Sequence, residues 1–421
     1  MKAIRLARRC TAVLFAAGLA ASALSAARAE TSIVVDVATG AVLSQKDATK
    51  RWYPASTTKL MTTYVALKAV SEGRAGLDTP VVMTRYAATQ APSKMGFEPG
   101  SVMRLDNALR MLMVKSANDV AVAIGTALGD GSVETFVEKM NAEAAALGMK
   151  DSHFVNPHGL PGAGQYSSAH DLALVAAALR RDFPAFSDYF STEAIKVGDA
   201  VINNHNGLLG RFEGADGMKT GYICASGFNL VGSATRDGRT LVAVVLGADG
   251  TAVRDRHAAE LLEEGFKATP GSGSMKLSDM PVGGGEVADI SERMCSPAGR
   301  TARAKEAKAE EEAEAAAAAK GPAAVEKRSQ LAQLQRPRSV VQVGLGGAAG
   351  TSKVAPGISL IAAYGLPIPT FRPPQPDDAA HAAAAELRAA AEPQTIASSA
   401  PPVDLGVTRR GIPVPTPRVA N

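Results

Sequence analysis

The sequence predicts an α+β protein in which one antiparallel sheet is flanked by helices. Two observations favour this class. Short runs of β-branched residues separated by turn residues stand near both ends of the segment from Thr31 to about Ala268. Helical periodicity fills the middle of the same segment. We therefore expect the terminal strands to share one sheet, with the helices packed around it.

The predicted strands come in two hairpins. Residues 32–37 and 41–43 flank a turn that contains Gly40. Residues 228–234 and 240–246 flank a turn with an Asp-Gly pair, which is a strong short-range signal for a hairpin.

The predicted helices lie between these hairpins, and one follows the second hairpin. The first begins at Ser56, and its apolar residues Leu60, Met61, Tyr64 and Leu67 recur at helical spacing. The expected helices span about residues 56–70, 105–114, 119–128, 133–147, 168–179 and 252–266.

Composition narrows the class of protein. The chain has 421 residues, of which 46% are hydrophobic and 20% charged, as in ordinary globular proteins. Neither wholesale disorder nor a protein with many membrane spans fits these values. The net charge of +4, from 45 basic and 41 acidic residues, is too balanced for a dedicated nucleic-acid binder, so no nucleic-acid partner is expected.

The chain divides into five predicted segments. Residues 1–29 combine a basic start, an apolar run and an Ala-Arg-Ala ending, as a cleaved signal peptide does; an uncleaved anchor is the alternative. Only two aromatic residues lie beyond Ala268, so the core is expected to end there. The segments are the signal peptide at 1–29, the folded domain at 30–268, a Gly-rich linker at 269–300, a charged Ala-rich segment of helix formers at 301–335, and a Pro- and Ala-rich disordered tail at 336–421.

Two cysteines remain after removal of the signal peptide. Cys10 belongs to that peptide, which leaves Cys224 and Cys295. An exported protein enters an oxidising compartment where the two can pair, but two free thiols fit the sequence equally well. The sequence leaves both states open.

A serine and a lysine at the start of the first helix suggest nucleophilic chemistry. Ser56 and Lys59 lie three residues apart, so their side chains share one helix face. A lysine can remove the proton of a serine hydroxyl if burial or a second cation lowers its pKa. By itself the pair is also explained by a serine that caps a helix.

Two further motifs strengthen the chemical interpretation. Ser116 and Asn118 stand between two predicted helices, where the hydroxyl can relay a proton and the amide can both donate and accept hydrogen bonds. Lys219, Thr220 and Gly221 lie on a predicted edge strand, and this lysine supplies a second cation. Three such motifs in this order, each at an element boundary, favour an enzyme with a serine nucleophile.

With these motifs the sequence resembles the serine penicillin-binding proteins and β-lactamases, and more narrowly the low-molecular-mass D-alanyl-D-alanine carboxypeptidases. The resemblance includes the phrases LGMKDSHFVNPHGL, SAHDLA and VVLGA and covers about Thr31 to Ala268. It implies a β-lactamase-like serine transpeptidase fold with a helical subdomain. It also implies that the enzyme removes the terminal D-alanine from peptidoglycan stem peptides, is acylated by β-lactams and needs no cofactor.

The resemblance assigns a role to each matching residue. Ser56 would be the acylated nucleophile, Lys59 its base, and Ser116 the group that passes the proton to the departing D-alanine. Asn118 would hold the peptide carbonyl. The remaining substrate-binding residues would be Lys219 and Thr220 for the terminal carboxylate, Gly221 beside them, Arg254 as an assisting cation, and Tyr222, whose backbone N–H would complete an oxyanion hole with that of Ser56.

The sequence argues against three alternatives to this function. A class A β-lactamase needs a carboxylate for its deacylating water, and no glutamate lies between Glu143 and Glu193. A zinc peptidase or a Ser-His-Asp hydrolase would need H-E-x-x-H or G-x-S-x-G, and both motifs are missing, so no metal is expected. Two alternatives stay open: a D,D-endopeptidase on cross-linked peptidoglycan, and a wall protein that binds penicillin or muropeptides without turnover.

The expected location follows from the signal peptide. The enzyme would be secreted across the inner membrane into the periplasm, in solution or associated with the wall. The final residues, RRGIPVPTPRVAN, contain prolines that a membrane-anchoring amphipathic helix would not tolerate, so membrane anchoring is not expected.

Overall fold

The computed structural model describes residues 31–273, 275–321, 324, 331, 334 and 336–348. The predicted signal peptide and most of the predicted tail lie outside these residues.

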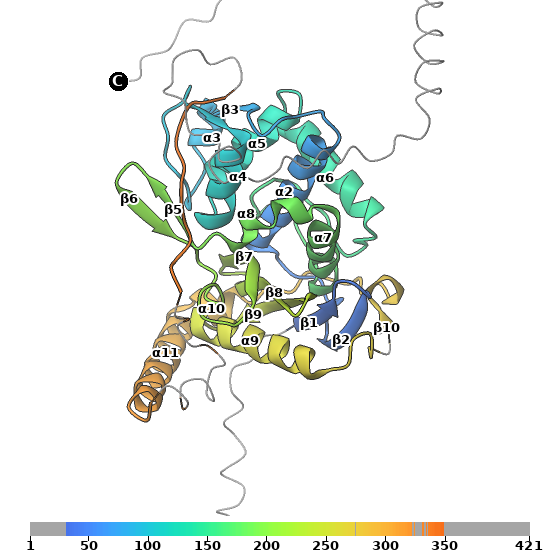
Figure 1. Cartoon of the computed structure of the whole chain (residues 1–421), viewed down its shortest axis with the longest axis vertical. Coiled ribbons are helices and arrows are strands. Elements are labelled where there is room, and N and C mark those ends of the chain that lie inside the picture. Colours follow the sequence, from blue (N-terminus) through green and yellow to red (C-terminus); the bar gives the residue numbers. More distant parts are fainter. Residues whose placement is uncertain are drawn as a thin grey trace, which may run out of the picture. The chain divides into compact units, whose positions relative to one another are not determined.

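A six-stranded antiparallel sheet forms the centre of the fold, in the order β10-β2-β1-β9-β8-β7 (Figure 1). Its first strand pairs with a strand from the other end of the domain, with Thr31 opposite Leu246. This confirms the predicted sheet shared by the terminal segments. The strands are β1 (Thr31–Asp36), β2 (Ala41–Lys46), β7 (Ala215–Ile223), β8 (Gly227–Arg236), β9 (Arg239–Ala248) and β10 (Met275–Lys276).

Both faces of the sheet are covered, because its central strands are apolar on both sides. On β1, Ile33 and Val35 belong to one core cluster, whereas Val34, between them, belongs to the other. Helix α9 (Thr251–Lys267) covers the second face, below the sheet in Figure 1. Helix α7 (Ala169–Asp182) packs against β1 and β9 from the first face.

A mostly helical subdomain lies above the sheet (Figure 1). One helix passes from one part to the other, as the turn η1 (Ala55–Thr58) continued by α2 (Lys59–Ser71). The other elements of the region between β2 and β7 are β3 (Pro80–Val82), α3 (Arg85–Ala88), β4 (Val102–Arg104), α4 (Leu105–Val114), α5 (Asn118–Leu128), α6 (Val133–Ala146), η2 (Pro184–Phe186), α8 (Asp188–Ser191), β5 (Ala194–Val197) and β6 (Ala200–Asn203).

The segment predicted as a Gly-rich linker, 269–300, instead packs along the domain. It contains β10, the turn η3 (Leu277–Asp279) and α10 (Ser291–Cys295). Its glycines serve close packing: the backbone N–H groups of Gly283 and Gly284 donate to the carboxylate of Asp151 at 2.6 and 2.8 Å. Buried Leu277 and Met294 anchor the segment, so a few apolar residues suffice where composition suggested a linker.

The segments beyond residue 296 differ in part from the expectation. Helix α11 (Pro297–Ala318) covers part of the Ala-rich segment expected at 301–335 and begins four residues before Thr301. The predicted tail begins at Arg336, yet β11 (Val340–Gln342) pairs in parallel with β5, and Val343 is buried. A three-residue strand and one apolar contact are too short to stand out from a Pro- and Ala-rich background.

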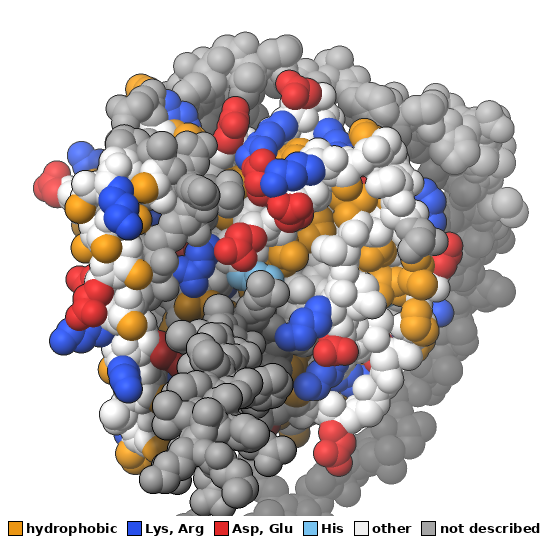
Figure 2. Space-filling view, turned by 90° about the horizontal axis from the view of Figure 1, so that it is seen from below, with side chains coloured by type: hydrophobic (Ala, Val, Ile, Leu, Met, Phe, Trp, Pro, Cys, Tyr) orange, Lys and Arg blue, Asp and Glu red, His pale blue; other side chains and the backbone are white. Residues whose placement is uncertain are grey.

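Charges of both signs are interspersed on the described part of the face seen from below (Figure 2). Ion pairs between side chains of opposite sign include Arg236 with Glu263 at 2.8 Å and Lys267 with Glu264 at 2.8 Å. No single sign of charge therefore dominates the described part of this face.

Two features are absent from the described residues. No single helix there is long and apolar enough to cross a membrane, although α5 and α6, bent by 88° to each other, pass that test as a pair. Within the same residues, no group of three His, Cys, Asp or Glu side chains is placed to hold a metal ion.

Candidate active site

Ser56 and Lys59 lie together where η1 meets α2. The Lys59 Nζ atom is 2.9 Å from the Ser56 Oγ, 2.7 Å from the Asn118 Oδ1 and 2.8 Å from the carbonyl oxygen of His158. Lys59 is completely buried. A tight turn presents the serine, because Ala55 adopts a φ of 48°, which is unusual for a residue with a side chain.

The surroundings of Lys59 favour its neutral form. Burial lowers its pKa well below 10.5, the nearby charge of Lys219 lowers it further, and Asp119 opposes the shift. A neutral amine has two protons and one lone pair. The two carbonyl-type acceptors, of Asn118 and His158, can take the two protons. The lone pair is then left to accept the hydroxyl proton of Ser56.

The loop between α4 and α5 supplies the second motif. Ser116 adopts a φ of 61° there and is buried, two residues before Asn118. The Asn118 amide is held at both ends, because its oxygen accepts from Lys59 and its Nδ2 donates to the carbonyl of Ala91 at 2.8 Å. Asn118 therefore orients Lys59 in this structure, and its predicted contact with a substrate carbonyl stays a prediction.

The third motif lies on β7, at the edge of the sheet as predicted. Lys219 is buried, and its Nζ donates to the carbonyl of Thr220 at 2.9 Å. Burial, and then the charge of Arg254, lower the pKa of Lys219 to about 7. An anionic partner, such as a substrate carboxylate, would therefore stabilise the protonated form of Lys219.

Gly221 allows β7 to approach the nucleophile closely. A Cβ atom at this position would lie 2.9 Å from the backbone nitrogen of Ser56 and 3.0 Å from the carbonyl oxygen of Pro54. Only glycine fits this approach without displacing the backbone. The next residue, Tyr222, is 41% exposed. Its ring packs on that of Phe228, with the ring centroids 4.3 Å apart.

Arg254 acts on the site through its charge. It is buried on α9, pairs with Asp255 at 2.7 Å and donates to the carbonyl of His205 at 3.0 Å. Its charge lowers the pKa of Lys219 and also contributes to the lowered pKa of His205, after burial and Lys219. The structure thus places Arg254 beside the Lys-Thr-Gly motif without a direct hydrogen bond to it.

Sequence reasoning missed two contributors to the site. His158 acts through its backbone carbonyl on Lys59, while its ring accepts a hydrogen bond from the backbone of Leu160 at 3.1 Å. Burial, followed by the charge of Lys59, lowers the pKa of this ring to about 3. Asp119 raises the pKa of Lys59, against the lowering by burial and by Lys219, and its carboxylate also accepts from the N–H groups of Met95 and Gly96. A backbone acceptor leaves no sequence signal, whereas Asp119 adjoins a motif that was recognised.

The fold and the site together define a serine–lysine acyl-transfer centre, in which a buried lysine faces a serine beneath an edge strand. A family model described as D-alanyl-D-alanine carboxypeptidase, peptidase S11, matches residues 18–250. That match covers more than half of the chain, and the chain belongs to this family.

Curated proteins and solved structures agree with this assignment. The chain is 37% identical over 240 residues to the D-alanyl-D-alanine carboxypeptidase DacD of Escherichia coli, which covers 55% of this chain and 62% of the relative. It is 33% identical over 244 residues to DacF of Bacillus subtilis, over 56% of this chain and 62% of the relative. The matched part spans about six tenths of the length of these relatives.

Solved structures share the fold. The crystal structure of penicillin binding protein 6B from Escherichia coli has a TM-score of 0.55 and 36% identity, over 57% of this chain and 77% of that one. Penicillin-binding protein D2 from Listeria monocytogenes, in an ampicillin-bound form, has a TM-score of 0.50 and 29% identity, over 56% of this chain and 97% of that one. The predicted penicillin-binding-protein-like α+β fold is confirmed.

Proposed function

We propose that this protein is a serine-type D-alanyl-D-alanine carboxypeptidase that removes the terminal D-alanine from peptidoglycan stem pentapeptides. One observation carries the proposal: a fully buried Lys59, with its pKa lowered by burial and by Lys219, has its Nζ 2.9 Å from the Ser56 hydroxyl. The family membership and the names of the relatives support the substrate class.

Acylation follows from this geometry. The neutral amine of Lys59 takes the hydroxyl proton while the Ser56 Oγ forms a bond to the carbonyl carbon between the two D-alanines. The backbone N–H groups of Ser56 and Tyr222 stabilise the oxyanion, and the close approach of Gly221 to the Ser56 backbone supports their convergence. The carbon–nitrogen bond then breaks, and the leaving amine receives a proton through Ser116.

Deacylation restores the enzyme. Water adds to the ester carbonyl, the ester bond to Ser56 breaks, and the shortened peptide leaves with a new carboxylate. Lys219 and Thr220 bind the terminal carboxylate of the substrate, with Arg254 as a second cation nearby. This anion favours the protonated form of Lys219, whose pKa of about 7 leaves it only partly charged in the free enzyme.

The same site would react with β-lactams as covalent inhibitors, since a relative has been solved in an ampicillin-bound form. We further propose that the protein works in the periplasm. The predicted signal peptide at 1–29 supports export. The disulfide between Cys224 and Cys295 supports an oxidising compartment.

The test uses the protein without residues 1–29, beside a Ser56→Ala variant. A fluorescent penicillin reports acylation, and diacetyl-Lys-D-Ala-D-Ala reports the release of free D-alanine. We expect both label and D-alanine from the native protein and neither from the variant. A Ser71→Ala variant serves as the matched control, because this serine lies at the exposed end of α2 and should leave both signals unchanged.

The other outcomes separate the alternatives. Label without free D-alanine would indicate an endopeptidase or a binding protein. A cross-linked muropeptide dimer, assayed in parallel, would then distinguish these two. The absence of label would refute the proposed serine chemistry.

A further inference from the structure

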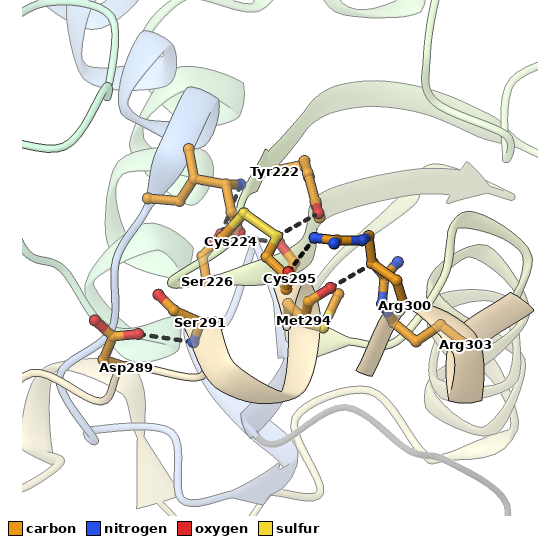
Figure 3. The surroundings of a disulfide bond; sticks show 11 residues. Tyr222, Cys224, Ser226, Asp289, Ser291, Met294, Cys295, Arg300 and Arg303 are labelled. Atoms are coloured by element: carbon orange, nitrogen blue, oxygen red, sulfur yellow. Dashed lines mark hydrogen bonds between the residues drawn. A yellow bond between two sulfur atoms is a disulfide. The ribbon is translucent and has the colours of Figure 1, made fainter. Parts of the chain in front are cut away.

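A segment that follows the catalytic domain closes one end of the active-site strand. Cys295 ends α10 and is bonded to Cys224, which lies three residues after Gly221 on the chain. The sequence left open whether these two cysteines pair, and in the structure they form a disulfide. The Tyr222 hydroxyl lies 3.5 Å from the sulfur of Cys295 (Figure 3). Helix α10 thus contacts the residue directly after the Lys-Thr-Gly motif.

Helix α10 is fixed to the sheet by contacts other than the disulfide. The side chain of Met294, which belongs to this helix, is fully buried. The Arg293 guanidinium lies 3.3 Å from the carboxylate of Asp249 and donates to the carbonyl of Gly247 at 3.0 Å, both at the end of β9. These contacts hold α10 against the same end of the sheet as the disulfide does.

The beginning of α11 secures α10 from the other side. Arg300 donates to the carbonyl of Cys295, and Arg303 donates to that of Met294 (Figure 3). Both acceptors belong to the last turn of α10, where carbonyl groups lack partners within the helix. The two arginines thus tie the short helix to a longer one.

These parts lie at the carboxyl end of β7, where Cys224 directly follows the strand. Within the described sheet, β7 has a neighbour on one side only, namely β8. An extended peptide can add to such an edge as a further strand. Tyr222, which is 41% exposed, and the disulfide beside it lie at the end of β7 toward which such a peptide would extend.

The direction of a bound substrate follows from the proposed function, on which this inference rests. The terminal carboxylate lies at Lys219 and Thr220, and the carbonyl under attack lies near the N–H of Tyr222. The part of the peptide amino-terminal to the scissile bond therefore continues toward Ile223 and Cys224. A short substrate ends before α10, whereas a longer stem peptide reaches it.

We propose that α10, fixed by the Cys224–Cys295 disulfide, is a specificity-determining wall for the part of the peptidoglycan stem amino-terminal to the scissile bond. The wall holds Tyr222 and confines the longer substrate along β7. It has no contact with a minimal substrate. Opening the disulfide therefore weakens the binding of long substrates and leaves acylation chemistry intact.

The experiment compares two substrates across cysteine variants. Native protein, Cys295→Ser, Cys224→Ser and the double variant are assayed with diacetyl-Lys-D-Ala-D-Ala and with a disaccharide-linked stem pentapeptide. We expect kcat/KM for the long substrate to fall about tenfold in all three variants, mainly through a higher KM; this corresponds to about 1.4 kcal/mol. For the short substrate and for penicillin acylation we expect changes within about twofold.

Reduction of the native protein with a phosphine should reproduce this loss, and the double variant should not respond to the reductant. If a cysteine variant fails to fold, as judged by its thermal melt, Arg293→Ala loosens α10 with the disulfide intact and should act in the same direction. Arg181→Ala, which removes a surface ion pair with Asp182 on α7, is the matched control.

Three results are distinguishable. An equal loss on both substrates would overturn the inference, because the disulfide would then act through the catalytic strand or the fold as a whole. An unchanged kcat/KM for the long substrate in the folded variants would also overturn it. If native protein releases no D-alanine from either substrate, the proposed function fails.

Discussion

Replacing Lys219 with methionine should make the protein more stable and inactive. Lys219 is 2% exposed and lies near a second buried cation, Lys59. Burial and the charge of Arg254 lower its pKa from 10.5 to about 7. Methionine fills a similar volume without a charge, so the variant avoids the cost of burying an ammonium group. It also lacks the group that binds the substrate carboxylate.

The size of the effect follows from linkage between protonation and folding. The unfolded chain keeps the proton of this lysine up to about pH 10.5, whereas the folded protein releases it above about pH 7. Each tenfold weakening of proton affinity costs about 1.4 kcal/mol, so below pH 7 the buried charge costs about 5 kcal/mol. The lost hydrogen bond to the carbonyl of Thr220 offsets about 1–3 kcal/mol of the gain. We expect a net stabilisation of about 3 kcal/mol at pH 6.

The dependence on pH has a definite sign. Between about pH 7 and 10.5 unfolding takes up a proton at Lys219, so the native protein becomes more stable as the pH rises through this window. The advantage of Lys219→Met should therefore be largest at pH 6 and shrink toward pH 10. Urea denaturation at pH 6, 8 and 9.5, with the disulfide intact, measures the difference between native protein and variant.

A control separates charge from packing. Lys267→Met removes an exposed cation on α9 and should change stability little at any of these pH values. The reasoning is refuted if Lys219→Met is less stable than native protein at pH 6, or if the difference between them does not depend on pH.

Three further substitutions test two parts of the site and one buried hydrogen bond of the fold. Gly221→Ala brings a Cβ to within 2.9 Å of the Ser56 nitrogen, so penicillin labelling should slow by about 10²-fold or more, measured by stopped labelling on a gel. Lys59→Arg replaces the amine that accepts the serine proton with a guanidinium that stays charged, so labelling should be lost, while a circular dichroism spectrum reports an intact fold. Trp52→Phe removes the hydrogen bond from the indole Nε1 to the buried carbonyl of Ser226 at 2.9 Å, and should lower the free energy of unfolding by about 1–3 kcal/mol in a urea titration.

Each of these expectations has a contrary outcome. Native labelling rates in Gly221→Ala would show that β7 need not approach the serine closely. Persistent labelling in Lys59→Arg would place the proton acceptor elsewhere. Native stability in Trp52→Phe would mean that water or a shifted side chain satisfies the carbonyl.

The sequence was most informative where local chemistry determines local structure. The Asp237-Gly238 pair predicted a hairpin; in the structure these two residues alone separate β8 from β9, and both have positive φ values, of 50° and 77°. Ser56 and Lys59 were expected on one helix face, and their functional atoms lie 2.9 Å apart. Short-range spacing thus determined both features.

Long-range contacts were beyond the same reasoning. The carbonyl of His158 meets Lys59 across 99 positions of the chain, through an atom that every residue has. The packing of the segment predicted as a linker depends on Asp151, whose carboxylate binds two glycine N–H groups more than 130 positions away. Amino-acid composition predicts neither contact, because each joins residues that come together only when the chain folds.

The pairing of β1 with β9 determines when this domain can fold. The first strand is a central one, with β2 on one side, but its other neighbour is made by residues 241–246, more than 200 positions later. Until that stretch has been synthesised, Ile33, Val34 and Val35 lack the backbone partners on one side, and Val34 lacks most of the core that α9 covers. Folding therefore waits for nearly the whole domain, and a nascent chain that stops before Arg239 presents an apolar strand with one unpaired edge.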